Sequence, residues 1–337
     1  MNILIIGAAG MLGRKLVASL IDRGQINGHR IEKLVLADIV APEEPHFSGS
    51  IETVSADLSG EGVADALIKT CPDLIFHLAA IVSGEAEADF EKGYRVNLEG
   101  TQALFEAIRR AALDKPYCPR LVFTSSIAVF GQPLPDLISD THVLAPLTSY
   151  GTQKAICELL LADYSRRGIF DGIGLRLPTI CIRPGKPNNA ASGFFSGILR
   201  EPLMGLEAVL PVADTVRHWF ASPRAAIGFL LHAAKLDTRR LGSRRTLSMP
   251  GLSATVADQI EALRRVAGDA AVALIRRKDD SAVADIVAGW PQGFDAQRAV
   301  DLGFRAERSF DEIIQAHIED ELAHDPAFAP QSGPKLS

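Results

Sequence analysis

The sequence predicts an α/β fold: a doubly wound parallel sheet followed by a smaller mixed α/β lobe. Over the first half of the 337 residues, short apolar runs alternate with amphipathic stretches of helical period. This is the pattern of parallel strands covered on both faces by helices. Near residue 180 the alternation gives way to the Pro-, Gly- and Asn-rich segment RPGKPNNAASG and shorter mixed elements. We therefore expect a first domain at 1–180, a substrate lobe at 181–325 and a loose tail at 326–337. Part of the segment 181–325 is allowed to pack with the first domain.

Apolar runs and helical periods follow one another in a regular order along the chain. The apolar runs predict strands at 2–6, 33–38, 51–57, 73–80, 120–126 and 172–180. Helical periodicity predicts helices at 11–24, 62–70, 87–112, 149–168, 222–236 and 254–267, with a further strand at 245–251. Because strands and helices alternate in the first half, neighbouring parallel strands are expected to be joined through helices that cross the sheet.

The charge and cysteine content exclude several classes of protein. The net charge is −6 at pH 7 and the basic residues are scattered, which disfavours a nucleic-acid or anionic-membrane surface. The first apolar run is short and lacks a basic leader, and no stretch reaches the roughly 20 apolar residues of a membrane span. The four cysteines lie far apart and the histidines show no metal-ligand spacing. We therefore expect a cytoplasmic protein without a bound metal.

A glycine-rich turn follows the first predicted strand. Gly7, Gly10 and Gly13 stand three apart in GAAGMLG, between that strand and the first helix. Glycines at these positions let the chain turn, let a pyrophosphate approach the start of the helix at Met11 and Leu12, and let the helix pack close to the sheet. The turn predicts a Rossmann-type dinucleotide-binding domain.

Asp38 ends the second predicted strand. A carboxylate at this position accepts hydrogen bonds from the ribose hydroxyls of adenosine and repels a 2′-phosphate, so NAD is favoured over NADP. A loop-capping role for Asp38 is the alternative. The same edge of the sheet is expected to contact the cofactor at Asp57, Leu58, Leu78, Ala79 and Ala80. His77 is expected to be a core residue and not a catalyst.

Hydroxyl groups and a tyrosine–lysine pair are expected at the carboxyl edge of the sheet. The fifth predicted strand ends in Thr124, Ser125 and Ser126, and ligands of such sheets bind at this edge. Tyr150 and Lys154 follow on the next helix at i and i+4, on one face. With an ordinary pKa of about 10, a tyrosine needs a nearby positive charge to act as a base at neutral pH. Taken alone, the pair fits an exposed helix face better, with the serines as caps at the end of the strand.

Taken together, these residues resemble the extended short-chain dehydrogenase/reductase family. The resemblance covers residues 1–190 and rests on the glycine triplet, Asp38, Asp57, HLAA, NLEGT, TSSIAVFG, the Tyr150/Lys154 pair and LRLPTICIRPG. It implies that Ser126 polarises the substrate oxygen, that Tyr150 moves the proton, and that Lys154 holds the nicotinamide ribose and lowers the tyrosine pKa. It also implies cofactor contacts at Asn97, Ser125, Tyr150, Lys154, Pro178, Thr179 and Ile180. A homodimer formed through a helix bundle is usual in the family.

Departures from the patterns within the family narrow the reaction. Ile127 and Ala128 follow Ser126 where the family's dehydratases have an acidic pair, so elimination is not expected. Arg217 matches the arginine that epimerases use on a diphosphate. The segment after it, 218–220, reads His-Trp-Phe and departs from the epimerase pattern.

The segments LIIGAAGMLGRKL, RPGKPNNAASGFFSGILREPL and RHWFASPRAA extend the resemblance into the second half of the chain. This wider resemblance implies NAD-dependent oxidation of the C2 hydroxyl of a small sugar acid. The carboxylate of such a substrate needs a charged anchor, and arginine offers a bidentate one. Candidate substrate residues are Ser83, Ser126, Tyr150, Arg183, Asn188, Ser192 and Arg217. Two alternatives stay open, a nucleotide-sugar 4-epimerase and a non-enzymatic dinucleotide-sensing protein.

Overall fold

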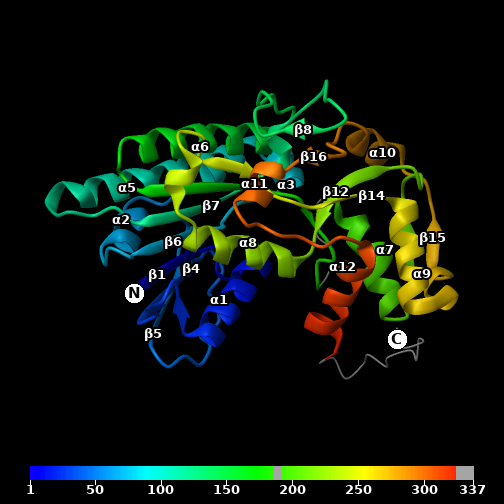
Figure 1. Cartoon of the computed structure of the whole chain (residues 1–337), viewed down its shortest axis with the longest axis horizontal. Helices are drawn as coiled ribbons and strands as arrows, with labels where there is room; N and C mark the ends of the chain where they lie inside the picture. The colour runs from blue at the N-terminus through cyan, green and yellow to red at the C-terminus, as the bar shows by residue number, and fades with distance from the viewer. Residues whose placement is uncertain (186–190, 324–337) are drawn as a thin grey trace.

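The centre of the molecule is a seven-stranded parallel sheet (Figure 1). The computed structural model describes residues 1–185 and 191–323, so Asn188 and the tail at 326–337 lie outside it. In spatial order the strands are β13 (Thr246–Ser248), β9 (Asp171–Leu177), β7 (Arg120–Ser126), β6 (Leu74–His77), β1 (Asn2–Ile6), β4 (Lys33–Asp38) and β5 (Ser50–Ser55). The strand order reverses between β1 and β6, which opens a crevice at their carboxyl ends. The predicted Rossmann-type α/β class is confirmed.

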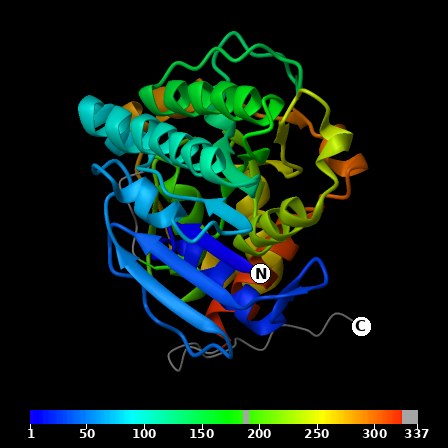
Figure 2. The same ribbon diagram turned by 90° about the vertical axis from the view of Figure 1, so that its left-hand side faces the viewer.

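Helices cover both faces of the sheet. One face packs against α1 (Met11–Arg23) and α8 (Pro223–Lys235), the other against α2 (Val63–Ile68), α5 (Gly100–Asp114) and α6 (Ser149–Arg166). Along β1, Ile3 and Ile5 belong to the first cluster and Leu4 and Ile6 to the second, as the two-residue period of a strand requires. Figure 2 shows α5 and α6 side by side on their face.

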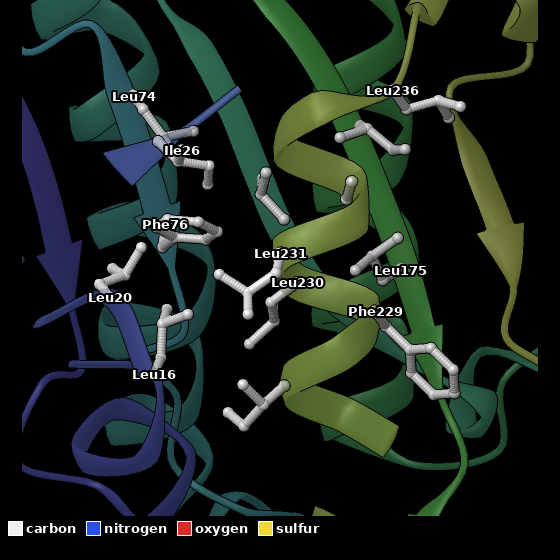
Figure 3. Close-up of a cluster of buried hydrophobic side chains, with 14 of the residues drawn as sticks. Leu16, Leu20, Ile26, Leu74, Phe76, Leu175, Phe229, Leu230, Leu231 and Leu236 are labelled. Carbon is white, nitrogen blue, oxygen red and sulfur yellow. The ribbon is translucent and has the colours of Figure 1, made fainter. Parts of the chain in front are cut away.

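The cluster between α1 and α8 joins two helices that lie far apart in the sequence. Figure 3 shows Leu16 and Leu20 of α1 on one side, Leu230 and Leu231 of α8 on the other, and Phe76 of β6 nearby. All of these side chains are at most 5% exposed. Each buried leucine contributes about 1.5–3 kcal/mol relative to an exposed one. The second half of the chain therefore helps to hold the dinucleotide-binding half together.

The remaining elements build the lobe and the connections (Figure 1). The lobe has a sheet of β10 (Thr179–Ile180), β12 (Arg217–Ala221) and β14 (Leu252–Thr255), a pair of β11 (Ala208–Leu210) and β15 (Ile275–Arg277), and helices α7 (Gly193–Leu203), α9 (Val256–Val272), α10 (Ser281–Ala288) and α12 (Phe310–His317). Short elements are β2 (Gln25–Ile26), β3 (His29–Arg30), α3 (Ser83–Ala88), α4 (Phe90–Gly93), β8 (Ile138–Ser139), β16 (Phe294–Asp295), α11 (Gln297–Asp301), π-turns at Tyr94–Glu99 and Ile318–Leu322, and 3₁₀ turns at Ile127–Val129 and Thr238–Leu241. No helix in the described part of the chain is long and apolar enough to cross a membrane.

Local signals in the sequence fix several helix ends. α1 ends at Gly24, which takes a left-handed φ of 62°, a conformation that glycine adopts without strain. The hydroxyl of Thr148 caps the start of α6 by accepting from the Gly151 N–H. Thr255 and Asp258 form a reciprocal capping box at the start of α9. Each such cap contributes about 1 kcal/mol.

Three predicted elements differ from the structure. The helix expected over 87–112 is divided into α3, α4, a π-turn and α5, because Asp89 leaves helical geometry and caps α4 through the Lys92 N–H. The strand expected over 172–180 is divided at Pro178, which has no N–H to give to a ladder, and β10 pairs with β12 of the lobe instead. The strand expected at 245–251 is present but shorter, as β13 over Thr246–Ser248, and it lies beside β9 in the large sheet.

Candidate active site

The glycine turn connects β1 to α1 and requires its glycines at two positions. Gly7 has a φ of 94°, and a Cβ there would lie 2.6 Å from the backbone nitrogen of Ala79. A Cβ on Gly13 would lie 2.1 Å from the Gly7 carbonyl oxygen. Gly10 is the N-cap of α1 and supplies no capping side chain. The first-turn N–H groups of α1, which have no partner within the helix, are therefore not capped by that residue.

Asp38 lies at the end of β4 and holds the glycine turn. Its Oδ2 accepts a hydrogen bond from the Ala9 N–H at 2.9 Å, and its Oδ1 accepts one from the Val40 N–H at 3.2 Å. The loop-capping role is therefore present. Each carboxylate oxygen has a second lone pair, so the same carboxylate keeps acceptor capacity for ribose hydroxyls.

The other residues expected beside the adenine and the backbone of the cofactor lie along the same edge. Asp57 accepts hydrogen bonds from the backbone and hydroxyl of Ser59, and the hydroxyl contact lowers the pKa of the Asp57 carboxyl. Leu58 packs in the core beneath α2 and α5. The N–H groups of Leu78 and Ala79 both donate to the Ile6 carbonyl, so these residues continue directly from the sheet. Ala80 is half-buried next to them.

A cavity of about 280 Å³ opens onto the glycine turn. Its lining comes from the turn and α1, from the ends of β6 and β7, and from the lobe: Gly7, Gly10, Met11, Leu12, Gly13, Leu78, Val82, Thr124, Arg183, Pro184, Gly193, Ser196 and Arg200. Free helix N–H groups and a guanidinium on its walls suit an anion. The residues present therefore fit a dinucleotide whose pyrophosphate lies at this turn.

Asn97 is buried and fixes the segment that follows β6. Its Oδ1 accepts from the Ile81 N–H at 2.9 Å and its Nδ2 donates to the Ile81 carbonyl at 3.2 Å. Nδ2 also donates to Gln153 Oε1 of α6 at 2.7 Å. Asn97 thus connects the segment after β6 to α6, the helix that carries Tyr150. Gln153 is a residue of this network that the sequence does not single out.

Ser126, Tyr150 and Lys154 come together at the carboxyl end of β7. The Ser126 hydroxyl lies near the Tyr150 phenol and lowers its pKa. The Ser126 hydroxyl also accepts from the Ala128 N–H at 3.1 Å. Lys154 Nζ donates to the Thr124 carbonyl at 2.9 Å and lies 5.8 Å from the centre of the Tyr150 ring. The i, i+4 spacing read from the sequence therefore puts both side chains on the face of α6 that meets β7.

Burial shifts the pKa values of both titratable groups. Removal from water raises the pKa of the Tyr150 phenol to about 12, although the Ser126 hydrogen bond lowers it. Removal from water also lowers the pKa of Lys154 to about 8. Lys154 therefore stays charged at neutral pH, while the phenol stays protonated until additional positive charge approaches.

His77 lies beneath this site and is neutral. It is 1% exposed, its Nε2 is bonded to the Thr101 hydroxyl at 2.8 Å, and burial lowers its pKa to about 3, with a further decrease from Lys154. Such a group neither accepts a proton at neutral pH nor faces the cavity, as the sequence predicts for a core histidine.

Ser125 belongs to a buried polar network that the sequence does not reveal. Its hydroxyl donates to Glu158 of α6, and Glu158 forms an ion pair with Arg176 of β9, Nη2 to Oε2, at 2.8 Å. The two charged side chains are at most 7% exposed. The network braces α6 against β7 and β9 one turn beyond Lys154. The i+4 spacing from Lys154 to Glu158 indicates that Glu158 lies on the same face of α6 as the site. The sequence does not indicate that Arg176 of β9 is the ion-pair partner of Glu158.

The remaining residues that the sequence predicts to contact cofactor or substrate do not all line the cavity at the glycine turn. Thr179 of β10 is bonded to buried His218 Nε2 at 2.7 Å, and His218 Nδ1 to the Pro291 carbonyl at 2.8 Å. Pro178 is buried and Ile180 half-buried beside them, and Ser83 is half-buried at the start of α3. Arg183 bonds the Ser192 hydroxyl and lines the cavity, whereas Arg217 is exposed at the start of β12 and contacts Ser253.

The sheet order, the glycine turn and the serine–tyrosine–lysine arrangement are those of a dinucleotide-dependent enzyme. The chain belongs to the NAD-dependent epimerase/dehydratase family, which it matches over residues 3–231. The predictions of family, of an NAD-dependent enzyme and of NAD as the cofactor are thereby confirmed.

Similar proteins are found along almost the whole chain. A D-erythronate dehydrogenase of Cupriavidus necator is 49% identical over 95% of this chain and 98% of its own length. A D-erythronate dehydrogenase of Haemophilus influenzae is 41% identical over 96% of this chain and 100% of its own length. A crystal structure described as the nucleoside-diphosphate-sugar epimerase of Agrobacterium tumefaciens is 63% identical, covers 98% of this chain and 96% of its own, and superimposes with a TM-score of 0.95.

Proposed function

We propose that this protein is a D-erythronate dehydrogenase, which oxidises the C2 hydroxyl of D-erythronate to the 2-oxo acid with NAD. The convergence of Ser126, Tyr150 and Lys154 at the edge of the sheet supports the chemistry, because it places a hydroxyl donor near a proton acceptor, with a cation 5.8 Å from the centre of the tyrosine ring. The likeness to two D-erythronate dehydrogenases over nearly the whole chain, lobe included, supports the substrate.

In the proposed reaction the protein handles the proton and the developing carbonyl. NAD, when bound along the glycine turn, supplies the acceptor for the hydride that leaves C2. Tyr150 accepts the proton of the C2 hydroxyl, and Ser126 donates a hydrogen bond to the oxygen as it becomes a carbonyl. Lys154, charged at neutral pH, favours the phenolate form of Tyr150. The hydroxyl oxygen thereby loses its proton and C2 its hydride, and the C–O bond becomes C=O.

We propose that the cofactor and the sugar acid bind to the residues that the sequence predicts for each of them. The cofactor would contact Gly7, Gly10, Met11, Leu12, Gly13, Asp38, Asp57, Leu58, Leu78, Ala79, Ala80, Asn97, Ser125, Pro178, Thr179 and Ile180, together with Tyr150 and Lys154. The sugar acid would contact residues drawn from Ser83, Ser126, Tyr150, Arg183, Asn188, Ser192 and Arg217.

A cytoplasmic homodimer is the proposed state of the protein. Leu113 of α5 is 73% exposed and Leu159 of α6 is 67% exposed, and these two helices lie side by side on one face (Figure 2). Exposed leucines on neighbouring helices favour burial against a second copy. Light scattering of the purified protein is expected to give twice the chain mass, and a monomer at micromolar concentration would contradict this.

A nucleotide-sugar epimerase is the second candidate. The observation that favours it is the 63% identity to a structure described as a nucleoside-diphosphate-sugar epimerase. An epimerase returns its hydride to the substrate, so it produces no net NADH. Arg217 is exposed and does not line the cavity at the glycine turn. Its position therefore does not support binding of a nucleotide-sugar diphosphate in that cavity.

One assay separates these functions. The protein is incubated with NAD and a panel of four-carbon sugar acids and UDP-sugars, and NADH formation is followed by absorbance while sugars are analysed by chromatography. We expect NADH with D-erythronate and none with UDP-sugars. Epimerised UDP-sugar without NADH would instead support the second candidate. NAD binding without turnover of any compound would support a sensing protein.

A further inference from the structure

Arg183 is a cation whose position is fixed by α7. Its backbone N–H donates to the Ser196 hydroxyl at 3.0 Å, and its carbonyl accepts from Arg200 Nη1 at 2.7 Å. Its own Nη2 donates to the Ser192 hydroxyl at 2.9 Å. Ser196 and Arg200 are both buried. The main chain and the side chain of Arg183 are therefore held in place before any ligand arrives, which lowers the entropy lost on binding.

Arg183 has no carboxylate partner among the residues that the structure describes. Within 1–185 and 191–323, no acidic side chain forms an ion pair with it, and the intervening KPNNA contains no acidic residue. Arg200, in contrast, pairs with Glu201. Burial lowers the pKa of Arg183, with a further decrease from Arg200. Since a half-buried cation without a counter-ion among the described residues is costly, this arrangement is suited to an incoming anion.

The other residues that line this cavity identify the anion. Arg183 and Arg200 line the 280 Å³ cavity together with Gly7, Gly10 and Gly13. A guanidinium and the free N–H groups at the start of α1 therefore face one space, and both favour phosphate oxygens. We propose that Arg183 binds the pyrophosphate of the dinucleotide from the lobe side, so that the cofactor is held between α1 and α7.

This assignment differs from the substrate role expected from the sequence. In a 2-hydroxy acid the carboxyl carbon is bonded directly to C2, so a residue that binds the carboxylate must line the same space as the groups that contact the C2 hydroxyl. Arg183 lines the same cavity as the glycine turn, and neither Ser126 nor Tyr150 lines that cavity. A pyrophosphate also brings two negative charges to the site, whereas a sugar acid brings one.

The test is calorimetric titration of the full-length protein with ADP-ribose, which has the pyrophosphate but no nicotinamide, and with adenosine, which lacks phosphate. Arg183→Gln is expected to bind ADP-ribose about 10- to 100-fold more weakly, with the affinity for adenosine unchanged. Arg276→Gln removes the same charge from an exposed ion pair with Glu207 and is expected to bind ADP-ribose within about twofold of the unaltered protein.

The inference rests on the proposed NAD site, and the two fail differently. If the unaltered protein does not bind ADP-ribose, the proposed function fails and the inference with it. If the unaltered protein binds ADP-ribose and Arg183→Gln binds it equally well, the pyrophosphate assignment alone is overturned. The same holds if Arg183→Gln shows only a raised KM for the sugar acid. Should Arg183→Gln not fold, Arg183→Lys keeps the charge but loses the fork. Weaker ADP-ribose binding by Arg183→Lys supports the assignment, and unchanged binding overturns it.

Discussion

Replacing Lys154 with methionine tests how Tyr150 becomes a base. Methionine keeps much of the buried stem and removes the charge, which lies 5.8 Å from the centre of the tyrosine ring. At that distance two unit charges interact by about 3 kcal/mol at an effective dielectric constant of about 20, equivalent to about two pKa units. At a given pH, about 100-fold less of the phenol would be ionised. We expect kcat at saturating NAD to fall by that factor at neutral pH.

The assay is the dependence of kcat on pH, measured by NADH formation across neutral and alkaline pH. In Lys154→Met the rising limb of the profile should move upward by about two pH units, so the loss narrows as the pH rises. Saturating NAD separates this effect from weaker binding of the ribose. A uniform loss at every pH, or a profile that does not move, would refute the electrostatic role of Lys154.

The same substitution should stabilise the fold. Burial lowers the pKa of Lys154 from 10.5 to about 8. Between those values the unfolded chain binds more protons than the folded one, so the free energy of unfolding rises with pH there and the charged lysine costs stability below that range. Lys154→Met removes a cost of about 3 kcal/mol at neutral pH. Urea unfolding at pH 7 measures it, and a less stable variant would show that the Nζ bond to the Thr124 carbonyl outweighs burial of the charge.

The remaining predictions concern the proton acceptor, the glycine turn and a buried histidine. Tyr150→Phe should abolish turnover with NAD affinity near normal in a fluorescence titration; more than a few per cent residual kcat would remove Tyr150 from the mechanism. Gly13→Ala meets the Gly7 carbonyl and should lose about 1–3 kcal/mol of stability and NAD binding, whereas Gly228→Ala, with open space around it, should gain about 0.5–1 kcal/mol. Equal urea midpoints for these two variants would contradict the packing argument. His218, with its pKa lowered to about 4 by burial, binds fewer protons folded than unfolded, so the free energy of unfolding should fall by about 2 kcal/mol from pH 7 to pH 5 on its account; His218→Gln should lessen that fall, and an unchanged acid dependence would exclude His218 as its source.

Features set by neighbouring residues were predictable from the sequence. The strand and helix periods, the glycine turn and the i, i+4 pair of Tyr150 and Lys154 depend on local geometry alone. They gave the fold class and the residues that meet at the carboxyl edge of the sheet. The left-handed end of α1 at Gly24 is of the same kind.

Features that depend on distant pairing were not predictable. β13 follows β9 by about seventy residues in the chain yet lies beside it, and nothing in the short apolar run RTLSMPG names its partner strand. The ion pair of Glu158 with Arg176 joins a helix to a strand, and each residue alone reads as a surface charge. Arg183 lines the same cavity as the glycine turn only because the lobe folds back onto the sheet. The sequence therefore indicated an arginine near the site but not which ligand group it would bind.

The central claim, that this chain removes a hydride from C2 of D-erythronate while Tyr150 takes the hydroxyl proton, is tested most directly with D-erythronate carrying deuterium at C2. The protein is incubated with this compound and NAD, and both products are analysed by mass spectrometry. We predict deuterium-labelled NADH in equal amount to an unlabelled 2-oxo acid. NADH without deuterium, or deuterium retained at C2 of the sugar acid without NADH, would contradict the account.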